Sequence, residues 1–185
     1  IRKYGAFEPL KTEEVANPAL TDDTVLVHIR AAAVNYSNVA IVTGKPFIAR
    51  LMGLGFTSPK FPIPGSEIAG QVEAVGKNVR RFRVGDEVYG DLSDFGRGGF
   101  AEYVAVPEKA LELKPTNISF VEAASVPETA LVALQALRDK GKLQPGQKVL
   151  IIGASGGIGT FAVQIAKAFG AEVTGVSSTK NTELV

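Results

Sequence analysis

The sequence predicts an α/β protein of two domains, a β-rich and mostly antiparallel first domain followed by the opening of a doubly wound parallel domain. Short alternating apolar segments, separated by Gly and Pro, occupy residues 25–113, and helix-type spacing replaces them from Ser119 onward. A strand, a glycine-rich turn and a helix follow over residues 149–169. We therefore expect the domains to comprise residues 1–118 and 119–185.

In the first domain, residues 25–30 alternate apolar and other side chains, as a half-buried strand does. Further strands are expected at 68–75, 86–89 and 100–106. Residues 43–65 are rich in Gly, Pro and Phe and are long for a plain connector. We expect this segment to be a functional loop or lid.

The second domain opens with a helix signal. Ser119 with Glu122 three residues later fits a capping box, and helix-forming residues continue to Leu137, with Pro127 expected to kink or interrupt them. After a turn at residues 143–147, the chain enters a strand.

That strand, residues 149–152, is a continuous apolar run of the kind buried on both faces of a parallel sheet. A helix follows, with Gly170 at its expected C-terminal cap, and then a second strand at 172–176. Doubly wound dinucleotide folds normally have about six strands. We expect the domain to be truncated after its second strand, and the chain to be part of a longer protein.

The composition excludes several classes of function. The 185 residues are 45% hydrophobic with a net charge of +1, so no strong field steers the chain to nucleic acid or anionic lipid. No apolar run is long enough to span a membrane. Cysteine is absent and His28 is the sole histidine, which removes the best zinc ligands. We expect a cytoplasmic protein without nucleic-acid or membrane partners, and we assign His28 no role.

The glycine-rich turn has the pattern A-x-G-x-x-G. Its strand-to-helix context gives this short pattern meaning, because the middle glycine admits backbone N–H groups to a pyrophosphate and the last allows close helix packing. A glycine turn needed only for packing is the alternative. The predicted cofactor-binding residues here are Ala154, Ser155, Gly156, Gly157, Ile158 and Gly159.

The choice of dinucleotide depends on the end of the second strand. NAD-selective folds place an acidic residue there, whereas residues 173–181 contain none. Hydroxyls of Ser177 and Ser178, with the ammonium of Lys180, suit a 2′-phosphate and favour NADP(H). The alternative is an ordinary Ser-rich turn.

The order of these motifs resembles the medium-chain dehydrogenase/reductase superfamily, and most of all its zinc-independent quinone oxidoreductase branch. The resemblance implies a GroES-like catalytic domain, a Rossmann-type NADP-binding domain, and NADPH-dependent reduction of quinones or activated alkenes. It also implies a homodimer when full length. The motifs that carry it, besides the turn, are Ala33-Val34-Asn35, Pro64-Gly65-Ser66-Glu67-Ile68-Ala69-Gly70, Val84-Gly85-Asp86-Glu87-Val88 and Gly98-Gly99-Phe100-Ala101-Glu102-Tyr103.

Where zinc-dependent relatives supply metal ligands, the motif alignment places Asn35, Ser66 and Glu128. This trio is a poor zinc site, and the four-cysteine structural lobe is absent. Without a Lewis acid, oxidation of a simple alcohol is hard, whereas hydride addition to a conjugated carbonyl gives an enolate that hydrogen bonds can stabilise. We expect no metal.

The resemblance implies that Asn35 orients the substrate carbonyl and that Ser37 is a weak proton relay. Tyr36 is a candidate for pyrophosphate contact or proton donation. For all three, side chains that bond their own backbone are the alternative.

The chain departs from the branch at three positions, and solvent water is therefore a further candidate for the proton donor. They are Asn38 for the usual Asp, Val132 for a cofactor-contacting Thr, and Phe47 near a position where some relatives carry Tyr.

Two other functions stay open: a non-catalytic NADPH-binding protein of the sensor or crystallin type, and an enoyl-thioester reductase. Among the aromatic residues, Phe56, Phe61 and Phe95 could line an apolar substrate pocket, although core positions are favoured for each.

Overall fold

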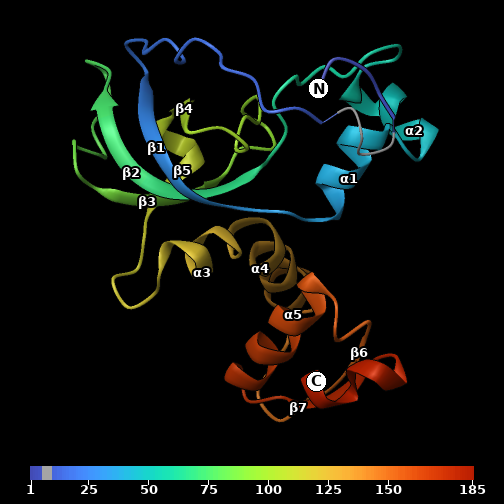
Figure 1. The fold of residues 1–185 in the computed structure, drawn as a ribbon. Coiled ribbons are helices and arrows are strands. Elements are labelled where there is room, and N and C mark those ends of the chain that lie inside the picture. Colours follow the sequence, from blue (N-terminus) through green and yellow to red (C-terminus); the bar gives the residue numbers. More distant parts are fainter. Residues whose placement is uncertain (6–9) are drawn as a thin grey trace. The chain divides into compact units, whose positions relative to one another are not determined.

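The computed structural model describes residues 1–5 and 10–185, which form two compact units, Ile1–Ser125 and Val126–Val185 (Figure 1). The first unit extends past residue 118 because a short helix, α3 (Phe120–Ala124), packs on its sheet. Ala123 and Ala124 form a small core with Ala69 there. The capping box expected at this helix is confirmed, since the Ser119 side chain accepts from the backbone N–H of Glu122.

The first unit is built on one antiparallel sheet of five strands. Their order across the sheet is β4-β1-β2-β3-β5, and every neighbouring pair is antiparallel. This confirms the predicted fold class. The strands are β1 (Thr24–Ala33), β2 (Glu67–Val75), β3 (Glu87–Asp91), β4 (Tyr103–Pro107) and β5 (Leu111–Leu113).

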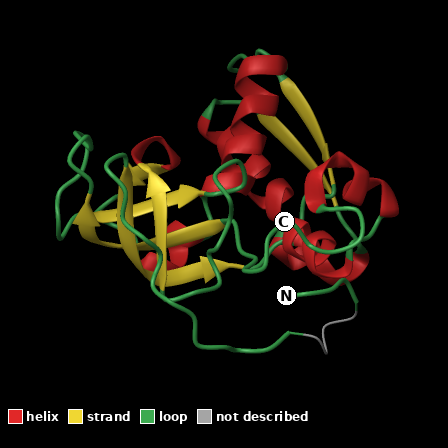
Figure 2. Ribbon diagram, turned by 90° about the horizontal axis from the view of Figure 1, so that it is seen from above, coloured by secondary structure: helices red, strands yellow, loops and turns green. Residues whose placement is uncertain are grey.

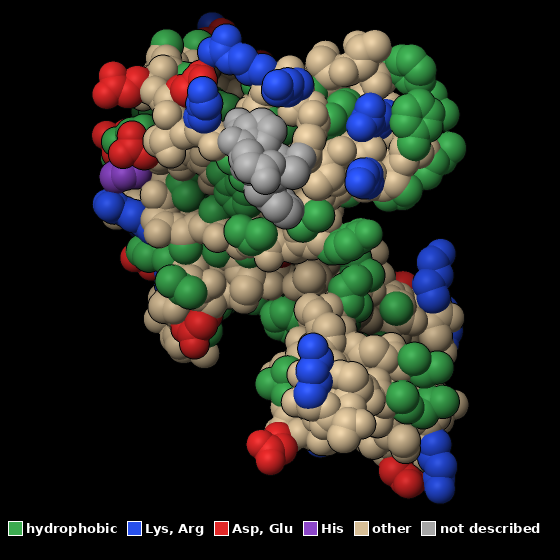
Figure 3. Space-filling model, turned by 45° about the vertical axis from the view of Figure 1, so that its right-hand side comes forward, with side chains coloured by type: hydrophobic (Ala, Val, Ile, Leu, Met, Phe, Trp, Pro, Cys, Tyr) green, Lys and Arg blue, Asp and Glu red, His purple; other side chains and the backbone are tan. Residues whose placement is uncertain are grey.

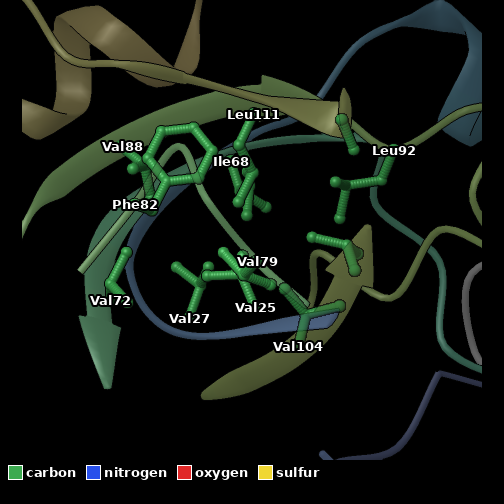
Figure 4. Close-up of a cluster of buried hydrophobic side chains, with 12 residues drawn as sticks. Val25, Val27, Ile68, Val72, Val79, Phe82, Val88, Leu92, Val104 and Leu111 are labelled. Atoms are coloured by element: carbon green, nitrogen blue, oxygen red, sulfur yellow. The ribbon is translucent and has the colours of Figure 1, made fainter. Parts of the chain in front are cut away.

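The sheet curves around an apolar core. Val25 and Val27 are fully buried, and Figure 4 shows their side chains pointing toward those of Ile68 and Val79. The apolar side chains that alternate along β1 therefore face the core, as predicted. Phe95 packs against this core. Strand β4 begins at Tyr103 rather than at residue 100, because the N–H groups of Gly99 and Phe100 donate to the carbonyls of Gly65 and Pro64.

Helices join β1 to β2. Helix α1 (Tyr36–Thr43) follows directly after Asn35, and α2 (Phe47–Ala49) continues into a π-helical turn, Arg50–Leu54. The 43–65 segment is therefore partly helical and not a plain loop. A 3-10 turn, Glu108–Ala110, separates β4 from β5.

The second unit is a βαβ unit with preceding helices, as predicted, and Figure 2 shows its two strands beside them. Pro127 begins α4, so it interrupts the predicted long helix rather than kinking it. Strands β6 and β7 are parallel. The elements are α4 (Pro127–Leu134), a π-helical turn (Gln135–Lys140), β6 (Lys148–Ile152), α5 (Gly157–Ala168), β7 (Glu172–Val176) and a 3-10 turn (Thr179–Leu184).

One expectation for β6 is wrong in this chain. Ile151 is buried, but Leu150 and Ile152 are 62% and 79% exposed, so β6 is not covered on both faces. Helices α4 and α5 pack on one side only, through Ala133, Ala162 and neighbouring side chains. Within residues 1–5 and 10–185, no helix has the length and apolarity needed to cross a bilayer.

Candidate functional site

The glycine-rich turn is fixed to the end of β7. The N–H groups of Gly153 and Ala154 both donate to the carbonyl of Val176, at 2.9 and 3.0 Å. Gly153 adopts a left-handed φ of 79°, which a residue with a side chain rarely takes. The turn therefore reverses at Gly153, and Ala154 keeps an ordinary φ, as its side chain requires.

The start of α5 is suited to an anion. Gly156 is the N-cap residue and makes no side-chain cap, and the first turn has no acidic residue. The Gly156 N–H donates to the carbonyl of Gly153 at 2.9 Å, whereas the N–H groups of the first helical turn have no acceptor within the helix, and the helix dipole adds positive potential at the same end. These residues fit the pyrophosphate of a dinucleotide.

Gly159 allows the helix to lie against the turn. A Cβ on Gly159 would lie 2.8 Å from the Cα of Ala154, and would also meet the carbonyl of Gly153. Such a contact is far shorter than normal packing allows, and Ala154 is fully buried. The predicted packing role of the last glycine is therefore visible in the structure.

The parallel register brings the predicted selectivity residues to the same edge. Ile152 pairs with Val176, so the chain after β7 leaves the sheet beside the turn after β6. Ser178 and Lys180 are exposed there and Ser177 is half-buried. Both clusters predicted for the cofactor thus come together.

Sequence reasoning missed Asn181. Its side-chain amide donates to the hydroxyl of Ser155 at 3.1 Å, which links the glycine turn to the segment after β7. Asn181 follows the predicted selectivity group directly but belongs to no motif, so no sequence signal predicts this contact.

The first unit holds a polar cluster where α1 begins. Asn35 is the N-cap residue of α1, and its Oδ1 accepts from the backbone N–H of Asn38 at 3.2 Å. The Ser37 hydroxyl donates to the same oxygen at 2.6 Å. The Nδ2 of Asn35 donates to the carboxylate of Glu67 at 2.8 Å. Asn35 and Ser37, predicted from sequence, therefore lie together, and Asn35 also caps its own helix.

Glu67 was not singled out in the sequence, although its side chain is 1% exposed and bonds Asn35 directly. Asn38, the departure noted above, is 2% exposed and donates weakly to Ser66 at 3.4 Å. Its Oδ1 accepts no hydrogen bond from the described residues. Tyr36 opens α1 with its side chain 79% exposed, and does not join this cluster.

The donor chemistry of the cluster does not fit a zinc ion. Asn35 and Ser66, which the predicted resemblance aligns with metal ligands, carry an amide and a hydroxyl, and neither is a good zinc ligand. In the described part of the chain, no group of three His, Cys, Asp or Glu side chains is placed to hold a metal ion.

Other aromatic residues have ordinary packing roles or lie on the surface. His28 stacks on Tyr103 with ring centroids 4.7 Å apart. Phe56 is 60% exposed and meets Phe47 edge to face, so a core position is wrong for Phe56. Figure 3 shows hydrophobic side chains gathered at the α2 end of the first unit beside Lys and Arg side chains.

Comparison with known proteins identifies the family. Residues 21–116 match the model of the alcohol dehydrogenase GroES-like domain. The chain belongs to this GroES-like family. The match contains all five strands of the first unit, together with Asn35, Ser37 and Glu67.

Relatives of the GroES-like chain include reductases. It is 40% identical to a 2-methylene-furan-3-one reductase of Solanum lycopersicum, over 98% of this chain and 47% of that protein. It is 36% identical to a chloroplastic NADPH-dependent alkenal/one oxidoreductase of Arabidopsis thaliana, over 98% of this chain and 47% of that protein. The predicted resemblance to the zinc-independent quinone oxidoreductase branch is confirmed.

Solved structures agree on the fold. The CurK enoyl reductase matches with a TM-score of 0.88 and 32% identity, covering 98% of this chain and 54% of that one. The Escherichia coli quinone oxidoreductase complexed with NADPH matches with a TM-score of 0.80 and 25% identity, covering 98% and 53%. The GroES-like chain thus spans about half the length of the proteins it matches.

Proposed function

We propose that this chain supplies the catalytic domain and the pyrophosphate-binding half of an NADPH-dependent reductase, which transfers hydride to a quinone or an α,β-unsaturated carbonyl without a metal. The observation that carries the proposal is the meeting of two clusters at the carboxyl ends of β6 and β7. One is the A-x-G-x-x-G turn and the other is the group Ser177, Ser178 and Lys180.

The roles in the second unit follow from charge. Bound NADPH supplies the hydride. The N–H groups at the start of α5 hold the pyrophosphate, and the hydroxyls of Ser177 and Ser178 with the ammonium of Lys180 hold the 2′-phosphate. Relatives and neighbours whose names include NADPH support this choice of cofactor.

The roles in the first unit are assigned to the cluster at the start of α1. Asn35 orients the substrate carbonyl through its amide and stabilises the developing negative charge on its oxygen. Ser37, whose hydroxyl donates to Oδ1 of Asn35 at 2.6 Å and so lies beside the proposed carbonyl site, is assigned the weak proton relay. Tyr36, with its exposed phenol, contacts the cofactor or donates a proton, and solvent water is the other proton source.

The proposal is tested with the protein at the full length of its coding sequence. NADPH oxidation at 340 nm is followed with a panel of quinones and enones, with and without a chelator. We expect turnover that the chelator does not reduce. No oxidation with any acceptor, or activity lost to the chelator and restored by zinc, would refute it.

Cofactor selectivity is tested by replacing Ser177, Ser178 and Lys180 together with Ala. Because these groups face the 2′-phosphate that only NADPH has, we expect the Kd for NADPH to rise at least tenfold and that for NADH to change little. Glu172→Gln, on exposed β7, is the matched control. If the Kd values for NADPH and NADH rise equally, residues 177–180 do not select NADPH and form an ordinary turn.

An enoyl-thioester reductase is the second enzymatic candidate, favoured by the similarity to the CurK enoyl reductase. Acyl-thioester substrates in the same assay distinguish it. A non-catalytic NADPH-binding protein is a further candidate, motivated by Asn38 and Val132, and tight NADPH binding without turnover would support it.

Two further proposals concern the full-length protein. Homodimerisation is checked by light scattering. A cytoplasmic location is checked by cell fractionation. The alternative is a chloroplast location, because one relative above is named as chloroplastic.

A further inference from the structure

We infer that Glu67 is a positioning residue that sets the direction of the Asn35 amide toward the substrate carbonyl. The inference rests on the proposed function of Asn35. It begins from a buried carboxylate: Glu67 is 1% exposed, on the first residue of β2. Burying a carboxylate is strongly unfavourable unless it accepts hydrogen bonds.

The two ends of the Asn35 amide meet partners of opposite kinds. A backbone N–H can only donate, so the N–H of Asn38 requires the oxygen of the amide on its side. The Glu67 oxygen Oε2 accepts at 2.8 Å, so the end of the amide that faces Glu67 is the nitrogen, the only donor on this side chain. Because both atoms belong to one planar amide, the cap contact and the Glu67 contact together set its orientation, with the oxygen toward Asn38 and the nitrogen toward Glu67.

Glu67 matters because the last side-chain torsion of Asn is broad. Without the Glu67 carboxylate, the amide loses one of the contacts that restrain rotation about this torsion, so it can swing through a wider range of directions. A small change in the direction of a donor is costly to catalysis, because misplacement by about 1 Å can lower a rate about 100-fold. The hydrogen bond to a carboxylate is also stronger than one to a neutral acceptor.

The geometry is tested on the 185-residue chain by NMR of side-chain amides. The Asn35 signal is assigned by its loss in Asn35→Ser. We expect one Nδ2 proton to be shifted downfield and slow to exchange, and Glu67→Leu to abolish both effects. Glu73→Gln, an exposed carboxylate on the same strand, is the control that leaves the signal in place. If Glu67→Leu leaves the chemical shift and the exchange rate of the Asn35 Nδ2 proton unchanged, the inference is overturned.

The role is tested by steady-state kinetics at full length. We expect Glu67→Leu to lower kcat about 10- to 100-fold with the Kd for NADPH unchanged. In an Asn35→Ala background the same substitution should lower kcat less than twofold, because the two residues act as one unit. If Glu67→Leu does not fold, Glu67→Gln is measured instead. We expect it to lower kcat threefold or more, and to have no effect on kcat in the Asn35→Ala background.

The outcomes separate two failures. If Glu67 and Asn35 lower kcat by independent factors, or Glu67→Leu changes only thermal stability, the positioning role is overturned and the reductase stands. If the unaltered protein turns over no quinone or enone, the proposed function itself fails, and the inference falls with it.

Discussion

Gly159→Ala should destabilise the second unit while leaving the first unit intact. The added Cβ would lie 2.8 Å from Cα of Ala154, a fully buried backbone atom that cannot move aside as a flexible side chain could. Overpacking of this kind costs about 1–3 kcal/mol. Replacing Gly by Ala within a helix by itself stabilises the folded state by about 0.5–1 kcal/mol, which offsets part of this loss. With a contact this short we expect a net loss of about 2 kcal/mol.

A loss of this size should be visible by melting. A change of 1 kcal/mol shifts Tm by about 4–8 °C in a domain of 60–100 residues, so the far-ultraviolet transition of the second unit should fall by roughly 8–16 °C. All four tyrosines lie in the first unit, so tyrosine fluorescence reports on that unit alone and should not change.

Gly157→Ala is the matched control. Its Cβ would meet only the Cγ2 of Thr129, at 3.5 Å, which is ordinary contact. This variant should melt at the same temperature as the unaltered chain or slightly higher. Equal melting of the Gly157 and Gly159 variants would refute the packing argument and leave the last glycine without a structural explanation.

Two predictions concern the first unit. Lys114→Met should lower the free energy of unfolding by about 1–3 kcal/mol, measured by urea denaturation. The buried Lys114 ammonium donates to the carbonyls of Pro115 and Ile118 at 3.0 and 2.6 Å, and both carbonyls would lose this donor. An unchanged midpoint of unfolding would contradict this prediction. Hydrogen bonds from the backbone N–H groups of Arg80 and Arg81 lower the pKa of Glu108, so its contribution to stability is present above its unfolded-state pKa and is lost as pH falls through the folded-state pKa. Glu108→Gln should therefore flatten the decline of Tm below about pH 4.5, and an unaltered pH profile would exclude this contribution.

Much of the second unit was predictable, because its signals are local. The glycine turn and the C-terminal Gly170 act over a few residues, as does the capping box of Ser119 and Glu122 at the end of the first unit, and all appear where the sequence places them. The exposure of Leu150 and Ile152 was not predictable, since an apolar run shows which faces can be buried but not whether the described chain contains the elements that bury them.

The polar cluster was predictable only in part, because its key contact joins residues 32 positions apart. Asn35 and Ser37 came from a motif, whereas Glu67 reaches Asn35 through the register of β1 on β2. That register contains two irregularities, between Leu26 and Val27 and between Ile29 and Ala31.

The two irregularities compensate each other. The first leaves one extra residue on β2 and the second leaves one on β1, so the pairing returns to Ala33 opposite Glu67. With only the first, Ala33 would lie opposite Ser66, and a slip of one residue turns every following side chain to the other face of the sheet. The Glu67 carboxylate would then point away from Asn35. Alternation along a strand carries no sign of a bulge, so the contact that we infer to direct the Asn35 amide depends on backbone features that appear only in the structure.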